Sequence, residues 1–150
     1  MRVVIQRVIR SSVYLPDEQL VAGKIDRGLL VLLGVGHDDT SDDMKYIIDK
    51  MIHLRIFEDK AGKMNLSAVD VNAEILVVSQ FTLYADCKKG RRPSFTNAAS
   101  PQKADEIYQT FVQQLRDRGF IVETGQFGAC MHVELVNDGP VTIVLDSQDK

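Results

Sequence analysis

The sequence predicts an α/β fold in which mixed β-sheets carry two helices. The apolar runs at residues 28–36 and 73–84 are typical of buried strands. Residues 40–54 and 101–118 place apolar side chains at helical spacing. The elements follow in the order strands, helix, strands, helix, strands, which is not the regular alternation of a doubly wound fold. The chain of 150 residues has no internal repeat and no linker-like segment, so we expect one domain over residues 1–150.

The first forty residues are dominated by strand-like segments. Residues 3–9 are rich in β-branched side chains, which favours a strand. Residues 13–15 and 20–25 flank the turn-like segment Pro16-Asp17-Glu18. The uninterrupted apolar run at 28–36 is typical of a strand that is buried on both faces.

An amphipathic helix is expected over residues 40–54. Thr40 together with Asp43, or Ser41 alone, supplies a side chain that can cap the first N–H groups of this helix. Its apolar positions recur every three or four residues and face the core: Met44, Ile47, Ile48 and Met51.

The middle of the chain is predicted to contain a short strand at residues 55–57, a turn at 59–62 and a second buried strand at 73–84. The loop that follows, residues 85–100, holds a dense group of cations. Four cationic residues stand within five positions of this loop: Lys88, Lys89, Arg91 and Arg92.

The second helix has clear start and stop signals. It begins at Ser100-Pro101, because serine caps a helix and proline suits the first helical position. It runs to about Arg118 and ends at Gly119. Strand-like stretches close the chain at residues 120–123, 131–136 and 141–145, and the last two alternate as strands with one buried face do.

Composition and charge exclude several classes of protein. The net charge of -3 and the pI of about 5.6 exclude a surface that is basic throughout, although a local basic patch is still allowed. Cys87 and Cys130 form neither a disulfide framework nor a zinc pattern, and the three histidines are scattered. Charges at Arg2, Arg7 and Arg10 interrupt any signal-peptide core, and no apolar run approaches the ~20 residues that span a bilayer. We expect a cytoplasmic protein with no cofactor, no metal, no membrane partner and no DNA partner.

The ordinary catalytic and phosphate-binding motifs are absent. Ser79 lies in VVSQF rather than in a G-x-S-x-G elbow. Gly34-Val35-Gly36 lacks the third glycine of a dinucleotide-binding loop, which favours a turn at the end of a strand. Cys87 stands beside Lys88 and Lys89, but a catalytic thiol also needs a base and no histidine is near it in sequence.

Two stretches combine small and polar residues in a way that fits a binding pocket. Residues 79–84, SQFTLY, end a buried strand, and pockets gather at the carboxyl ends of strands in α/β proteins. Residues 137–142, NDGPVT, contain a Gly-Pro pair, whose peptide bond is cis at modest cost. On composition alone, the first stretch is equally a strand that emerges into solvent, and the second is a turn between two strands.

Taken together, SQFTLYAD and NDGPVT resemble the two signature motifs of the D-aminoacyl-tRNA deacylases, the D-tyrosyl-tRNA deacylase family. The resemblance extends over the whole chain, because RVVIQRV, GLLVLLGV, GRRPSFTNAASP and TGQFGACMHVELVNDGPVT follow in the family's order. The first hairpin is more divergent, and Cys130 stands where an acidic residue is expected. Neither difference touches the expected pocket.

This resemblance implies a homodimer without a metal, with two sheet layers and a helical layer. The family hydrolyses the ester between a wrongly attached D-amino acid and the 3′-terminal adenosine of tRNA, and it also acts on glycine mischarged on tRNA(Ala). Its role is chiral proofreading in translation quality control. By the same resemblance, Gly139 and Pro140 form a chirality filter with a cis bond that projects into the pocket of the other subunit and rejects L-amino acids.

The resemblance also assigns residues to the pocket. Ser79, Gln80, Phe81 and Thr82 form its wall, Ala104 leaves room for the adenine, and Phe127 and Met131 complete it. The expected catalytic groups are Thr82, Gln80 and the backbone of Phe81, with help from the substrate's 2′-hydroxyl. Backbone donors near Phe81 and Thr82 stabilise the oxyanion, and Thr82 as a nucleophile ranks second because no base lies next to it. The cations Lys88, Lys89, Arg91 and Arg92 are the expected tRNA phosphate contacts.

Two other functions remain open at this point. A non-catalytic module that holds tRNA ends would explain the basic loop and the missing catalytic triad. Such modules usually expose stacking aromatic residues, and only Tyr84 and Phe95 are near the basic loop. A hydrolase of small D-aminoacyl esters that does not use tRNA is the second alternative.

Overall fold

The computed structural model describes residues 1–150 and contains one bent, mixed β-sheet, a small hairpin and two α-helices. The strands are β1 (Arg2–Leu15), β2 (Leu20–Ile25), β3 (Gly28–Gly34), β4 (Phe57–Glu58), β5 (Met64–Leu66), β6 (Glu74–Ser79), β7 (Val122–Thr124) and β8 (His132–Asp146). The helices are α1 (Ser41–His53) and α2 (Pro101–Asp117), with short 3-10 helices η1 (Phe81–Tyr84) and η2 (Ser147–Asp149). The mixed α/β fold predicted from the sequence is confirmed.

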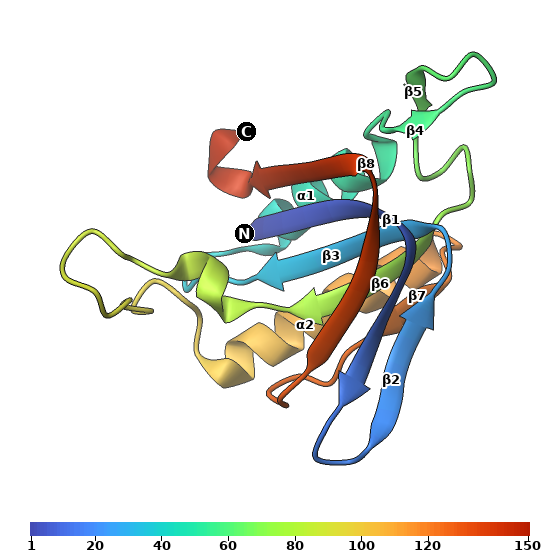
Figure 1. The fold of residues 1–150 in the computed structure, drawn as a ribbon. Coiled ribbons are helices and arrows are strands. Elements are labelled where there is room, and N and C mark those ends of the chain that lie inside the picture. Colours follow the sequence, from blue (N-terminus) through green and yellow to red (C-terminus); the bar gives the residue numbers. More distant parts are fainter.

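The long strand β1 organises the sheet (Figure 1). One edge of β1 pairs antiparallel with β3 through residues 2–8 and with β2 through residues 11–15. The other edge pairs antiparallel with β8 from Arg2 to Tyr14. Strands β6 and β7 extend the sheet from β3 in parallel pairs. The carboxyl ends of β3 and β6 therefore lie side by side, which is the place where the sequence predicts a pocket.

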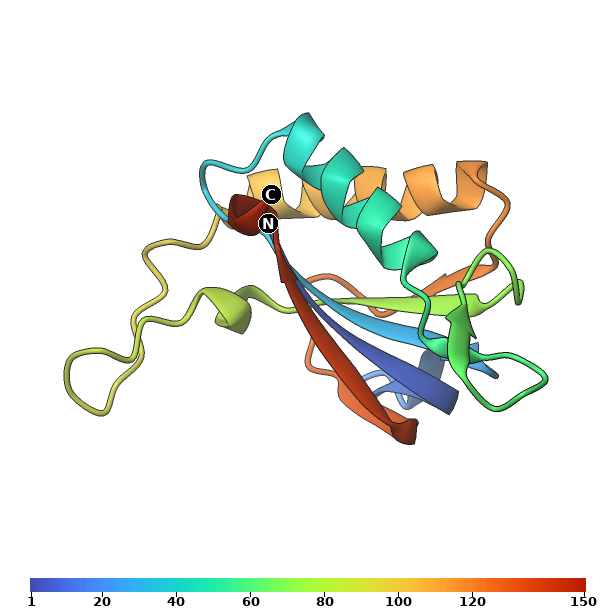
Figure 2. The same cartoon turned by 90° about the horizontal axis from the view of Figure 1, so that it is seen from above.

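The two faces of the sheet are covered differently. Both helices lie on one face, where they bury the larger core (Figure 2). On the opposite face the bent half of the sheet closes over a smaller core that contains Val13, Ile25 and Leu76. Gly23 of β2 lies against the backbone of Thr124 in β7, so the bend brings the first hairpin across the end of the sheet. Helices, sheet and bent half together form the expected three layers.

Local signals set the helix boundaries as predicted. The hydroxyl of Thr40 accepts a hydrogen bond from the N–H of Asp43, and the Asp43 carboxylate accepts one from the N–H of Thr40. The hydroxyl of Ser100 accepts a hydrogen bond from the N–H of Lys103, and Pro101 occupies the first turn of α2. Neither helix is both long and apolar enough to cross a bilayer.

Several predicted strand boundaries are wrong. The strand expected over residues 73–84 ends at Ser79, because the chain there folds into η1. The strands expected at 131–136 and 141–145 form one strand, β8, because both segments pair with β1 instead of with each other. The intervening residues 138–141 bulge out of the ladder, between the pairs Gln6–Thr142 and Val8–Asn137, rather than forming a hairpin turn. Residues 3–9 and 13–15 likewise form one strand, β1.

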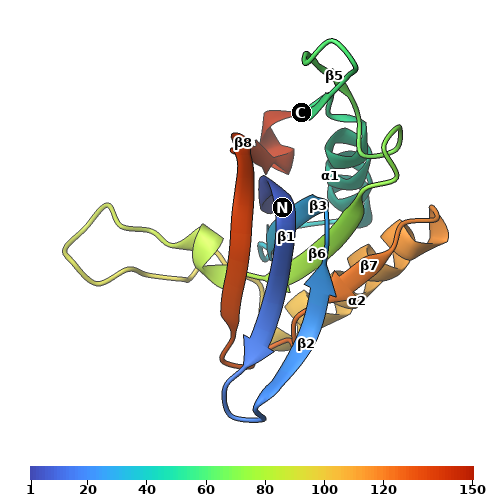
Figure 3. The same cartoon turned by 45° about the vertical axis from the view of Figure 1, so that its right-hand side comes forward.

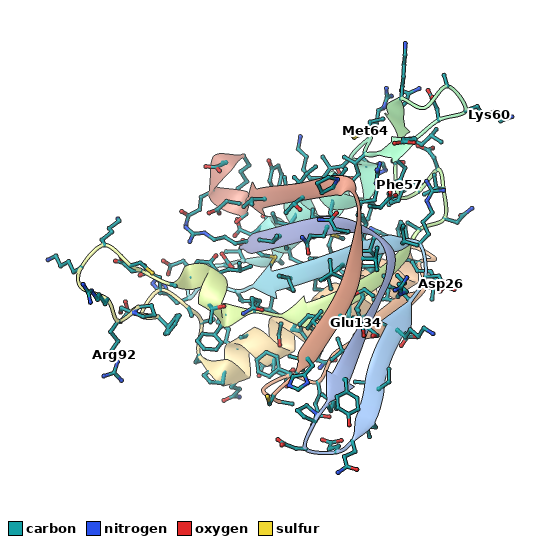
Figure 4. All side chains as sticks on the ribbon, viewed as in Figure 1. Asp26, Phe57, Lys60, Met64, Arg92 and Glu134 are labelled. Carbon is teal, nitrogen blue, oxygen red and sulfur yellow. The ribbon has the colours of Figure 1, made fainter.

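Two segments project from the body of the molecule at opposite ends (Figures 1 and 3). One is the loop that carries the basic cluster, with Arg92 near its tip (Figure 4). The other is the β4–β5 hairpin, which carries Lys60 and Met64 (Figure 4).

Candidate active site

A cavity of about 360 Å³ opens where the carboxyl ends of β3 and β6 meet the start of α2. The predicted motif residues Ser79, Gln80 and Phe81 form one wall. Ala104, which the resemblance places beside the adenine, and Phe127, which it places in the pocket, line the same cavity. No aspartate, glutamate, histidine, lysine or arginine is among its lining residues, which are Leu33, Val35, Ser79, Gln80, Phe81, Phe95, Ala98, Ala99, Pro101, Ala104, Tyr108, Phe127 and Gly128.

The turn η1 places the polar motif at the mouth of this cavity. The N–H of Gln80 bonds the carbonyl of Leu33 at 2.8 Å, which fixes the end of β6 to β3. The chain then turns into η1, whose first N–H groups have no partner within the turn. The side-chain amide of Gln80 donates to the hydroxyl of Thr82. Thr82 is exposed beside the cavity rather than among its lining residues, and its hydroxyl is held by a neutral amide instead of a base.

Helix α2 forms the opposite wall. Ala104 is nearly buried in its first turn, where its small side chain leaves the cavity open. Tyr108 lies one helical turn further on and donates its hydroxyl to the carbonyl of Val77 at 2.8 Å. Burial raises the pKa of Tyr108 to about 12, so this phenol stays protonated at neutral pH. Its ring lies 5.9 Å from that of Phe127, and together they close the inner end of the site.

An aromatic pair stands at the rim. Phe81 is 58% exposed, and its ring meets that of Phe95 edge to face with a centroid separation of 5.0 Å. Phe95 follows the basic loop in sequence, so the pair joins the end of that loop to η1. Sequence reasoning assigned Tyr108 no role in the pocket. The spacing Ala104-Tyr108 is the signal that could have indicated it, since residues four apart share a helix face.

Met131 lies apart from this cavity. It is absent from the lining residues and packs beside the smaller core on the other face of the sheet. A side chain added at Gly125 would clash with its sulfur, so the two segments are in close contact. The pocket role that the resemblance assigns to Met131 therefore has no counterpart within one subunit.

Gly139 and Pro140 form the exposed tip of the bulge in β8. The peptide bond between them is cis, which confirms that prediction. Gly139 has a φ of +123°, a conformation that L side chains rarely adopt. The N–H of Val141 bonds the side-chain oxygen of Asn137 at 3.1 Å, which spans the bulge. Neither Gly139 nor Pro140 lines the cavity of its own subunit.

Arg7 holds the bulge from beneath. Its side chain is buried, its Nε donates to the carbonyl of Asp138 at 3.1 Å, and it pairs with the Asp138 carboxylate at 3.2 Å. Its Nη1 donates to the carbonyl of Ile56 at 2.5 Å, so one guanidinium links β8 to the segment before β4. Sequence reasoning missed this residue. The available signal was a charge in the middle of an otherwise apolar, β-branched strand.

The basic loop leaves the site next to η1. Asp86 and Ser94 close its base with backbone hydrogen bonds of 2.7 and 3.0 Å. None of its cations forms an ion pair with an acidic residue of the chain, and all four are exposed: Lys88, Lys89, Arg91 and Arg92.

A second cavity of similar size, about 380 Å³, lies far from these motifs. It is bordered by Asp49, His53 and Arg118 near the carboxyl ends of the two helices. None of the predicted site residues lines it.

Comparison with known proteins agrees with the resemblance of the motifs. A family model described as D-Tyr-tRNA(Tyr) deacylase matches residues 4–146. A protein from Clostridioides difficile (strain 630) named D-aminoacyl-tRNA deacylase is 60% identical over 147 residues, which are 98% of this chain and 97% of that protein. One of the same name from Thermotoga petrophila is 59% identical over 147 residues, with the same shares of each chain.

Two solved structures share the fold. One is described as c-Myc DNA Unwinding Element Binding Protein and superposes with a TM-score of 0.90 at 41% identity, covering 97% of this chain and 98% of that one. The other is described as a probable eukaryotic D-amino acid tRNA deacylase. It superposes with a TM-score of 0.80 at 19% identity, covering 96% and 97%, and supports the fold alone.

Proposed function

The chain belongs to the D-Tyr-tRNA(Tyr) deacylase family, and from this premise we propose that it hydrolyses the ester bond of D-aminoacyl-tRNAs. The products are free tRNA and the D-amino acid. The observation that carries the proposal is the 360 Å³ cavity, because the SQF motif, Ala104 and Phe127 meet there from separate parts of the chain. We place this activity in the cytoplasm, as a chiral proofreading step of translation.

The terminal adenosine fits the wall formed by α2. Ala104 leaves space for a flat base, and Phe127 and Tyr108 offer aromatic surface beside it. Single-stranded nucleic acids are commonly held by stacking of bases on such side chains. The ester carbonyl then lies toward Ser79, Gln80 and Phe81 at the end of β6.

The chemistry requires little from ionisable side chains. Water attacks the ester carbonyl, and the tetrahedral intermediate expels the 3′-oxygen of the ribose, which takes up a proton. Backbone N–H groups at Phe81 and Thr82 stabilise the oxyanion, and one such donor contributes about 10²–10³ in rate in other hydrolases. The substrate's vicinal 2′-hydroxyl assists the attacking water. Thr82 does not act as the nucleophile in this proposal, since Gln80, its hydrogen-bond partner, cannot accept a proton as a base does.

The chirality filter is proposed to come from a second subunit. Gly139 and Pro140 are exposed and do not line their own cavity, so an isologous dimer is the arrangement in which each tip can enter a pocket. The neighbouring strands also expose large apolar side chains, with Ile9 53% and Val144 68% exposed, which supports contact with a partner. The tip would occupy the space that an L side chain needs. Glycine, which lacks a side chain, passes such a filter, so glycyl-tRNA is a proposed substrate.

The basic loop is proposed to bind phosphates of the acceptor stem. Its four cations are exposed and unpaired, on a loop that follows η1 in the chain. Phosphate contacts contribute affinity that does not depend on the nucleotide sequence, which suits an enzyme that accepts many tRNAs. We propose tRNA, and neither DNA nor a membrane, as the partner.

One experiment separates this proposal from a tRNA-end-binding module and from a hydrolase of small esters. The protein is incubated with D-tyrosyl-tRNA, L-tyrosyl-tRNA and a free D-tyrosine ester, and release of tyrosine is followed. Selective loss of the D-tRNA ester is the expected result. Binding without release would favour the module, and equal cleavage of the free ester would favour the small-ester hydrolase.

A further inference from the structure

A third cavity, which is polar and has a volume of about 260 Å³, adjoins the active-site cavity. Of its eight lining residues only one is hydrophobic, and the set includes both amide and charged side chains. The lining residues are Arg2, Gly36, His37, Asp38, Asp39, Tyr84, Asn97 and Gln148.

The two cavities share their dividing wall. Val35 lines the apolar cavity, and the next residue, Gly36, lines the polar one. Ala98 and Asn97 divide in the same way, and an isolated β-bridge between Gly36 and Ala98 forms the ridge between the cavities. The turn η1 also contributes to both, with Phe81 on one side and Tyr84 on the other. A ligand that extends over this short ridge would occupy both cavities.

Hydrogen bonds within the chain hold the floor of the polar cavity in place. Asp39 accepts hydrogen bonds from the N–H of Gly36 at 2.7 Å and from the hydroxyl of Tyr84 at 3.4 Å. Burial, followed by the nearby Asp39 carboxylate, raises the pKa of Tyr84, which keeps it a donor. The guanidinium of Arg2 lies 4.7 Å from the centre of the Tyr84 ring and bonds Asp146 at 2.6 Å. The cavity is therefore pre-organised.

The rim of the cavity, by contrast, carries polar groups that have no partner. The exposed side-chain amides of Asn97 and Gln148 make no hydrogen bond within the chain, although both residues line the cavity. Asp38 is also at the rim, with a side chain that is 85% exposed and a carboxylate oxygen 2.9 Å from Nδ1 of His37. Two amides and a carboxylate around a small polar space can both donate and accept, as base-edge recognition requires.

We infer that this polar cavity binds the cytidine that precedes the terminal adenosine of tRNA. The inference rests on the proposed function, since the adenosine must occupy the adjoining apolar cavity. Cytosine presents an amine that a carboxylate such as Asp38 accepts, and two acceptors that the amides of Asn97 and Gln148 can reach. Uracil presents a carbonyl in place of that amine and would face Asp38 unfavourably. Protein modules read single-stranded RNA bases in this manner.

The test uses three non-hydrolysable ligands in calorimetric titrations. The first is 3′-(D-tyrosylamino)-3′-deoxyadenosine, and the other two extend it at the 5′ side with cytidylyl or uridylyl. We expect the cytidylyl ligand to bind about tenfold more tightly than the uridylyl ligand, within the discrimination of one well-read base edge. The uridylyl ligand corrects for the added phosphate and ribose, because it carries both.

Two variants assign the effect to the cavity. Asn97→Ala and Gln148→Ala are each expected to remove most of the preference for cytidylyl over uridylyl and to leave the affinity for the nucleoside ligand unchanged. Gln109→Ala is the matched control, because Gln109 is an exposed amide on α2 that bonds only Asp105. It should retain the full preference.

The outcomes distinguish failure of the proposed function from failure of the cytidine site alone. If the nucleoside ligand does not bind the wild type, the proposed function fails and the inference falls with it. If the nucleoside ligand binds but cytidylyl and uridylyl ligands bind equally, the inference alone is overturned. Retention of the full cytidylyl preference by both cavity variants would also overturn it, because the preference would then arise elsewhere.

Discussion

The active-site cavity and the Gly139–Pro140 bulge are built by opposite means. The cavity is a space between packed apolar elements, and its walls come from β3, β6, η1 and α2 of the same subunit. The bulge is a short exposed segment, and a buried guanidinium, that of Arg7, holds it through backbone and carboxylate contacts. By this difference, the proposed adenosine site depends on shape, whereas the proposed filter depends on a few directed polar contacts. Substitutions in the two regions should therefore impair different properties of the protein.

The largest expected effect comes from filling the cavity. Ala104→Phe should reduce deacylation of D-tyrosyl-tRNA by about 10³-fold or more, because a phenyl ring would occupy the space proposed for the adenine and displace the reacting ester. Rate assays together with circular dichroism measure activity and fold. Ala61→Phe, at an exposed position in the β4–β5 hairpin, is the control. Near-normal deacylation by Ala104→Phe would show that the adenosine binds elsewhere.

A smaller effect is expected from releasing the bulge. Arg7→Met should lower the free energy of unfolding by about 2–3 kcal/mol, since the carbonyls of Asp138 and Ile56 lose a buried charged donor. It should also raise the relative rate on L-tyrosyl-tRNA, because the tip is no longer held in place. Urea unfolding and paired D and L assays measure the two effects. Arg10→Met, at an exposed position of the same strand, should change neither. Unaltered D/L selectivity in a destabilised Arg7→Met protein would separate the bulge from chirality.

The basic loop should affect binding without affecting selectivity. Replacing Lys88, Lys89, Arg91 and Arg92 by alanine should weaken tRNA binding and flatten its salt dependence. The log–log slope should fall by about 0.7–0.9 for each phosphate that the loop no longer neutralises. Filter binding over a range of salt concentrations gives this slope. The control is the pair Lys60→Ala and Lys63→Ala, both between β4 and β5, in the hairpin that projects at the opposite end of the molecule (Figure 4). An unchanged slope would mean that the phosphates lie on another surface.

The smallest effect is expected at Thr82. Thr82→Ala should keep deacylation within about tenfold of the wild type, because its hydroxyl has an amide and not a base as its partner. Single-turnover deacylation measures the rate. A loss of about 10⁴-fold or more, as for nucleophiles of concerted sets, together with a trapped acyl-Thr82 adduct, would reverse the mechanism.

Features that depend on neighbouring residues are predictable from the sequence. The capping box of α1 and the Ser100-Pro101 start of α2 are local patterns, and both appear in the structure. The pocket wall at residues 79–81 is predictable for a similar reason, because it lies at the carboxyl end of a strand with a long apolar run.

Features that depend on distant pairing are not predictable in this way. The NDGP segment in β8 has turn chemistry and so favours a hairpin turn, because nothing local indicates that both of its flanks pair with β1. The role of Arg7 could not be predicted for the same reason, because its hydrogen-bond partners lie about 50 and 130 positions away in the chain. Met131 was expected in the pocket but packs on the far face of the sheet. The bend of the sheet causes this placement, and local sequence does not indicate the bend.

The pairing of β1 with β8 has a consequence for how the molecule folds. It joins Arg2 to Asp146, so the ladder closes a loop that contains nearly the whole chain. Closing such a loop costs conformational entropy before its contacts form, and folds rich in distant pairs assemble slowly. The segments of the adenosine cavity are closer in sequence, whereas the Gly139–Pro140 tip exists only when this last ladder has formed. An intermediate that lacks the β1–β8 ladder would hold a pocket without the proposed filter against L-amino acids. Late closure of the sheet would therefore make the proposed selectivity against L-amino acids depend on completion of folding.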